Sequence, residues 1–204
     1  MQYTVSQPLP LPLRHDPLKA LVAPRPIGWI STLASDGSAN LAPYSFFQIL
    51  SEKPGIVVYS SGGRKDSVVN AEHSGDFVCN IVTSVMLDQM ILSAAPLPHG
   101  QSEFAYAGLE TEASHSVKAP RVKGVAAALE CKLIKVEELL DIEGRQINRV
   151  MVFGQVVSVY IDDKYLVSGM VDTAKMELVA RCGYFDYAIV DRVIVPERTG
   201  IKPI

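Results

Sequence analysis

The chain has few cysteines and no paired-cysteine motif. Cys79, Cys131 and Cys182 are odd in number and widely spaced, which argues against a disulfide framework and against a C-x-x-C metal site. We therefore predict no metal centre. Cys79 alternates with Phe77 and Ile81 in an apolar run, so we expect it to be a buried thiol, because free cysteine packs as a small hydrophobe.

A strong excess of charge is also missing. The formal net charge is −3, and the Lys and Arg residues are scattered apart from the pair Arg64-Lys65, so the sequence lacks the basic patch typical of nucleic-acid binding. No uncharged apolar run reaches the roughly 18–20 residues that a membrane span requires. The N-terminus is rich in proline and lacks the basic-then-apolar order of a signal peptide. We expect a cytoplasmic protein with no nucleic-acid or membrane partner.

The composition is that of a globular protein, with 48% hydrophobic and 20% charged residues in 204 positions. This length suits one domain with a substantial core. We predict an N-terminal arm over residues 1–24, one domain over residues 25–195 and a C-terminal tail over residues 196–204. The prolines of the arm disfavour regular structure. The arm is either a floppy leader or a segment that packs across a partner subunit.

Signals for β-strands are dense after residue 26. Strands are predicted at residues 27–33, 55–60, 76–82, 126–136 and 150–161. The Asp36-Gly37 pair predicts a tight hairpin turn, because glycine tolerates positive φ. Residues 40–42 and 45–50 are then expected to form its return strand, with Pro43 marking an edge or a bulge.

Helix signals are short and few. Residues 66–73 are predicted to be helical and to end at Gly75, and residues 85–95 have apolar side chains at helical spacing. Residues 99–121 are polar and turn-rich, which predicts a long surface excursion of the functional or partner-facing kind. The chain after residue 163 is expected to be less regular. Many strands with two short helices predict a mainly β (α+β) fold, a small antiparallel barrel with helical decoration.

One loop suits a phosphate group. Residues 59–67 read Y-S-S-G-G-R-K-D-S, so a strand leads through small residues and two cations into a helix. Glycines let backbone N–H groups approach an anion, hydroxyls donate hydrogen bonds, and Arg64 and Lys65 add full charge. The order of a Walker A loop is absent. The alternative is a solvated turn in which Asp66 or Ser67 caps the helix.

Several segments, in order over roughly residues 20 to 185, resemble the flavin reductase-like family of flavoredoxin type. They read R-P-I-G-W-I-S-T-L, S-D-G-S-A-N-L-A-P-Y-S-F-F, G-I-V-V-Y-S with R-K-D-S-V-V-N, G-D-F-V-C-N-I-V, A-L-E-C-K-L and A-R-C-G-Y. The resemblance implies a split β-barrel that forms a homodimer, with FMN in a groove at the subunit interface.

The resemblance also implies which residues contact FMN. For the isoalloxazine and ribityl groups they are Asn40, Leu41, Ala42, Pro43, Tyr44, Ser45 and Phe46, with Thr32 beside them. For the phosphate they are Ser60, Arg64, Lys65 and Ser67, while Asn80 faces the cofactor from the next strand and Arg181 adds charge. No catalytic side chain is assigned, because the flavin itself carries the electrons.

Structural alternatives remain for several of these residues. Asn40 could simply finish a hairpin turn, and Arg181 could belong to a structural ion pair. Tyr44, Phe46 and Phe47 could be core aromatics. The four histidines lie in the arm, at a helix end and in the excursion, so we expect surface positions for them.

The chain departs from the family pattern at two places. Related short-chain NAD(P)H:flavin reductases carry G-D-H before the strand that here spans residues 150–157, whereas this chain has Asn148-Arg149. Tyr184 stands where many relatives have a second glycine. We expect an oxidoreductase that passes electrons from NAD(P)H through FMN to an acceptor. The alternatives are a flavoredoxin-type electron carrier reduced by a redox partner protein, which the missing histidine favours, and a binding module for another ligand.

Overall fold

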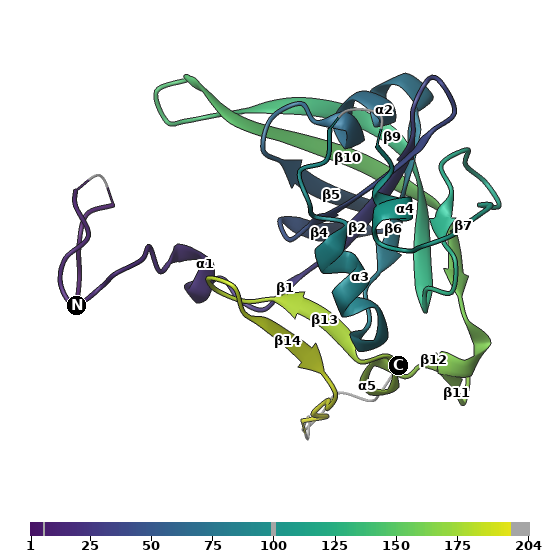
Figure 1. Cartoon of the computed structure of the whole chain (residues 1–204). Helices are drawn as coiled ribbons and strands as arrows, with labels where there is room; N and C mark the ends of the chain where they lie inside the picture. Colours follow the sequence, from purple (N-terminus) through teal and green to yellow (C-terminus); the bar gives the residue numbers. More distant parts are fainter. Residues whose placement is uncertain (6, 99–100, 197–204) are drawn as a thin grey trace.

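A seven-stranded antiparallel sheet forms the body of the computed structural model, which describes residues 1–5, 7–98 and 101–196 (Figure 1). Its strands are β2 (Gly28–Leu33), β3 (Ala39–Tyr44), β4 (Phe47–Glu52), β5 (Gly55–Ser61), β6 (Asp76–Ile81), β9 (Ala127–Leu140) and β10 (Gln146–Ile161). Their order in the sheet is β3-β2-β6-β9-β10-β5-β4. The predicted strands are confirmed, and residue 144 lies in the turn between the two longest.

The sheet curls until its two edges meet. β3 and β4 lie at opposite edges of the sheet, yet only Ser45 and Phe46 separate them in the chain. Three Cα–Cα steps of 3.8 Å span at most about 11 Å, so the edges must lie side by side. The prediction of a single return strand over residues 40–50 is therefore wrong, because the chain changes edges there. Pro43 lies in edge strand β3, as predicted, where its missing N–H is tolerated.

Apolar side chains pack on both faces of the curved sheet. The interior holds Ile30, Tyr59, Phe77, Cys79, Cys131 and Val152. The outer face carries a second core of Trp29, Val78, Met90, Phe104 and Val122. Neighbours such as Phe77 and Val78 enter different cores because side chains alternate across a strand. Cys79 is fully buried, as expected.

Short helices cover this barrel. Helix α2 (Asp66–Ser74) buries Val68 and Ala71 against the interior core and ends at Gly75, whose φ is +75°. The second predicted helix is realised as η1 (Ser84–Met86) followed by α3 (Leu87–Leu92). No helix of the described part of the chain is long and apolar enough to cross a membrane.

The described part of residues 99–121, predicted to be a long surface excursion, is instead held against the sheet by hydrogen bonds. It contains α4 (Glu103–Tyr106), β7 (Thr111–Glu112) and β8 (Arg121–Val122). The buried Glu130 carboxylate accepts bonds from the backbone N–H groups of His115 and Ser116, and buried Asp76 accepts from those of Lys118 and Ala119. These bonds keep the segment over the outer core. The predicted surface position of His99 lies outside the described residues.

The chain after residue 163 is more regular than predicted. β1 (Arg25–Pro26), β13 (Leu178–Arg181) and β14 (Tyr187–Val190) form a second small sheet. Four short elements come between β10 and β13 in the chain: η2 (Asp163–Tyr165), β11 (Leu166–Val167), β12 (Met170–Val171) and α5 (Thr173–Met176). The arm contains one short helix, α1 (Leu18–Leu21), beside this sheet (Figure 1). The arm leads directly into β1, and β1 pairs with β13. The second sheet therefore lies where the arm joins the barrel.

Close packing inside the barrel predicts a cost for one added methyl group. In Gly154→Ala the new Cβ would lie 2.3 Å from Phe77 Cζ and 3.1 Å from Cys131 Cβ, so we expect the free energy of unfolding to fall by about 1–3 kcal/mol. Denaturant titration measures this change. Gly55→Ala is the control, because its nearest contact, Val156 Cβ, is 3.4 Å away. Equal stability of the two variants would contradict the packing described.

Candidate functional site

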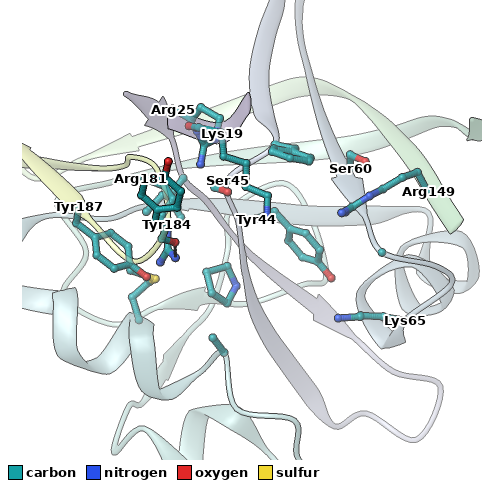
Figure 2. A pocket seen from close by; sticks show the side chains of 16 residues that line it. Lys19, Arg25, Tyr44, Ser45, Ser60, Lys65, Arg149, Arg181, Tyr184 and Tyr187 are labelled. Carbon is teal, nitrogen blue, oxygen red and sulfur yellow. Dashed lines mark hydrogen bonds between the residues drawn. The ribbon is translucent and has the colours of Figure 1, made fainter. Parts of the chain in front are cut away.

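A cavity of about 410 Å³ opens where the two edges of the sheet meet (Figure 2). One wall comes from the end of β3 and the link to β4, with Tyr44, Ser45 and Phe46. Another comes from the end of β5 and the loop after it, with Ser60, Gly62 and Lys65. The small second sheet adds Arg181, Tyr184 and Tyr187. The cavity therefore draws its walls from segments far apart in the sequence.

Two hydrogen bonds hold the predicted phosphate loop against the predicted ring-binding strand. The N–H of Ser60 donates to the carbonyl of Phe46 at 2.8 Å. The hydroxyl of Ser67 donates to Asn40 Oδ1 at 2.9 Å. The segments 60–67 and 40–46 are thus brought together at both of their ends.

The loop end of the cavity has the features of an anion socket. Gly63 adopts φ +84°, which allows the tight turn into α2. Lys65 precedes the first turn of this nine-residue helix, whose N–H groups carry partial positive charge. Within the described part of the chain, no carboxylate forms an ion pair with Lys65. Its ammonium group is thus available to an anion in the cavity.

Two buried hydroxyls beside this end have no hydrogen-bond partner among the described residues: Tyr44 Oη and Ser61 Oγ. Tyr44 is 8% exposed and Ser61 is fully buried. Burial raises the pKa of Tyr44 against the smaller opposing effect of the nearby Ser67 and Ser61 hydroxyls, so Tyr44 remains a donor at neutral pH. Unsatisfied buried polar groups are costly. Tyr44 lines the cavity, so its hydroxyl is placed to meet a polar ligand there, whereas Ser61 does not line it.

Arg64 lies away from the cavity, although it was predicted to hold the phosphate beside Lys65. Its guanidinium forms ion pairs with Glu72 and Glu138 on the exposed surface. Successive residues at a helix start point in different directions, and these two carboxylates already neutralise Arg64. Of the two neighbouring cations, Lys65 lines the cavity and Arg64 does not.

Thr32, Leu41 and Asn80 also lie inside the protein rather than on a cavity wall, and all three are fully buried. The hydroxyl of Thr32 accepts from Asn70 Nδ2 at 3.2 Å. The side-chain amide of Asn80 donates to Trp29 O at 2.9 Å and accepts from Val122 N at 2.8 Å. These bonds give Thr32 and Asn80 structural partners, and their contacts with a cofactor stay a prediction.

Asn40, Ala42 and Ser67 line a neighbouring cavity of about 430 Å³, which shares Pro43, Tyr44 and Lys65 with the first. Asn40 Nδ2 donates to Glu103 Oε2 at 3.1 Å, so its amide braces β3 against α4 rather than only ending a turn. Arg181 lines the first cavity, and its Nη2 donates to the carbonyl of Tyr184 at 2.6 Å. The other predicted site residues thus line the two cavities that share Tyr44, whereas Thr32, Leu41, Arg64 and Asn80 line neither.

Sequence reasoning missed Lys19, Arg25 and Arg149 as cavity residues. Arg149 comes close because β10 pairs with β5, with residue 150 opposite residue 61. A Cβ built on Gly62 would lie 3.7 Å from Arg149 Nη1. The long predicted strand after residue 149 was the available signal for Arg149, whereas nothing in the pattern of the arm indicated Lys19.

Comparisons with known proteins agree with this fold. The family model described as flavin reductase like domain matches residues 21–174. An uncharacterized protein of Aquifex aeolicus strain VF5 is 34% identical over 169 residues, which cover 80% of this chain and 83% of that protein.

Two solved structures are also similar. The 2-nitrobenzoate 2-nitroreductase NbaA of Pseudomonas fluorescens superposes with a TM-score of 0.79 at 29% identity, covering 91% of each chain. A protein from Shewanella frigidimarina NCIMB 400 with a split barrel domain gives a TM-score of 0.79 at 24% identity, covering 89% of this chain and 90% of that one. The predicted split β-barrel is confirmed.

The internal contacts of Asn80 predict a loss of stability on its truncation. Asn80→Ala leaves the buried N–H of Val122 and the carbonyl of Trp29 without partners, so we expect the free energy of unfolding to fall by about 1–3 kcal/mol. Denaturant titration tests the stability, and FMN titration of the folded variant should give the wild-type affinity. Weakened FMN binding with unchanged stability would instead support a cofactor contact.

Proposed function

This chain belongs to the flavin reductase-like family, and we propose that it binds FMN and transfers electrons from NAD(P)H to an acceptor. The observation that carries the proposal is the cavity at the barrel seam, which Lys65 and Tyr44 both line; among the described residues, Lys65 forms no ion pair and the Tyr44 hydroxyl makes no hydrogen bond. A flavin nucleotide needs a cationic phosphate socket and polar donors beside an aromatic wall.

We assign the phosphate to the loop end of the cavity. Ser60, Gly62 and Lys65 would hold it, with the start of α2 adding backbone donors. The segment 43–46 would lie beside the ring system, and the Tyr44 hydroxyl would donate a hydrogen bond to the cofactor. Arg181 would contribute positive charge from the second sheet.

FMN, when bound, supplies the redox chemistry of accepting a hydride and passing electrons on. The described residues lining the 410 Å³ cavity include no carboxylate and no histidine. We propose that the protein's part is to bind and orient the cofactor and the reactants and to exclude water. The Pseudomonas fluorescens relative is a nitroreductase, which supports an enzymatic role with a small organic acceptor.

We propose that the protein acts as a cytoplasmic homodimer. Ile49 and Leu50 on edge strand β4 and Val157 and Val159 on β10 expose large apolar side chains in the single chain. Exposed apolar side chains on an open strand edge favour a partner surface. A second copy of the chain is the partner that the family resemblance implies.

An electron carrier of flavoredoxin type is the second candidate. Asn148-Arg149 occupies the place of the G-D-H motif, so a cation stands beside the socket where the related reductases have a histidine. A carrier would keep FMN bound and receive electrons from a protein partner.

The assignment of the socket predicts unequal effects of two neighbouring cations. Lys65→Ala should weaken FMN binding about ten- to a hundred-fold, because a charge-assisted contact contributes about 1.5–3 kcal/mol. Arg64→Ala should leave the affinity nearly unchanged, because Glu72 and Glu138 already engage this side chain. Flavin fluorescence titration measures both values. A loss with Arg64→Ala equal to that with Lys65→Ala would place the phosphate elsewhere.

Reduction without oxygen separates the enzyme from the carrier. We expect NADH or NADPH to bleach the visible band of the FMN-loaded protein, since the proposed enzyme takes hydride directly from the nicotinamide. Dithionite serves as the control for a reducible flavin. Bleaching by dithionite with none by either nicotinamide would favour the carrier, and a protein that binds no FMN would contradict both.

A further inference from the structure

A second chamber of about 640 Å³ adjoins the seam cavity. The two share the walls formed by Lys19, Arg25, Phe46, Arg149 and Tyr184. The second chamber extends beneath the arm, where it also meets Asp16, Leu18 and Val22. Any ligand in it would therefore lie next to the proposed FMN site, so the inference below rests on the proposed function.

Arg25 holds the walls of this chamber in place. It is 8% exposed, and its Nη1 donates to the carbonyls of Lys19 and Val22 at 2.5 Å each. Its Nη2 donates to the carbonyl of Cys182 at 2.9 Å. A Cβ on Gly183 would lie 2.5 Å from Ala20 Cβ, so helix α1 packs directly on the 182–186 turn. The chamber is thus built from fixed backbone.

Aromatic rings line two sides of the chamber. The ring centroid of Phe46 lies 5.2 Å from Arg149 Cζ and 5.8 Å from Arg25 Cζ. Tyr184 occupies a left-handed backbone conformation with φ +53°, one that favours glycine, and still places a ring in the wall. Because a tyrosine stands at this position, where glycine would leave space, its ring narrows the chamber.

The charge of the chamber is positive. Within the described residues, Lys19 and Arg149 have no carboxylate partner. Among the described lining residues the carboxylate is that of Asp16, which accepts the N–H of Leu18 at 2.8 Å at the start of α1. None of the described residues that line the chamber is a serine or threonine, whereas Ser60 lines the phosphate socket. Cations between aromatic and aliphatic walls suit a carboxylate on a flat apolar body better than a phosphate.

We infer that this chamber is a binding site for a planar organic anion, specifically an aromatic carboxylate, as the second substrate class of the protein. Phe46 and Tyr184 contact the ring, and Lys19 and Arg149 bind the carboxylate. Arg149 stands where the resemblance implies the histidine of G-D-H. Its role in this chamber is to select the electron acceptor by charge.

Benzoate and its neutral analogue benzamide test the inference by binding alone. Each is titrated into the FMN-loaded protein and followed by the flavin difference spectrum and by calorimetry. We expect benzoate to bind at least about tenfold more tightly than benzamide, because charge-assisted contacts to two cations are lost with the amide. Lys19→Met and Arg149→Gln should each weaken benzoate binding about tenfold and leave benzamide binding unchanged.

Arg64→Gln is the matched control, because it removes one positive charge outside both cavities and should leave benzoate binding unchanged. The FMN affinity of each variant is measured separately, since Arg149 lies near Gly62. Failure of wild type to bind FMN contradicts the proposed function. Normal FMN binding with equal affinity for benzoate and benzamide, or benzoate binding insensitive to Lys19→Met and Arg149→Gln, overturns the anion site alone. The anion site is also overturned if Lys19→Met and Arg149→Gln weaken the binding of NADH but not the binding of benzoate.

Discussion

The two-residue link between β3 and β4 is the constraint on which the site depends. Ser45 and Phe46 join the opposite edges of a seven-stranded sheet, so closing the barrel and forming the cavity are one event. The bonds from Ser60 N to Phe46 O and from Ser67 Oγ to Asn40 Oδ1 fasten the loop after β5 across this seam. Ligand-binding backbone is therefore held by the strand pairing that also creates the core.

The cations around the seam form two groups: those already bound to carboxylates or backbone carbonyls, and those without a carboxylate partner among the described residues. Arg64 is engaged by Glu72 and Glu138, and Arg25 donates three hydrogen bonds to backbone carbonyls. Lys65 and Arg149 have no such carboxylate among the described residues. Because an ion pair neutralises a cation, only the second group attracts an anionic ligand strongly.

The two chambers share Phe46 and Arg149, so the proposed cofactor site and the proposed acceptor site have walls in common. The arm supplies α1, which the small second sheet and Arg25 hold beside the seam. The proline-rich N-terminal arm thus forms part of the wall of the second chamber. Arg149 and Tyr184, which stand at the two places where the sequence departs from the expected family pattern, line both chambers.

The sequence by itself determined five strands of the barrel, helix α2 with its glycine end, the buried Cys79 and the family. Each of these depends on local chemistry: residue periodicity, turn residues and contiguous motifs. Only the tertiary structure decided that residues 40–50 divide between two sheet edges, that Arg64 pairs with two carboxylates, and that Asn80 and Thr32 are fully buried. It also brought Lys19 and Arg149 to one cavity. Such outcomes depend on which residues meet across long separations in the chain, and a pattern of neighbours along the sequence does not contain that information.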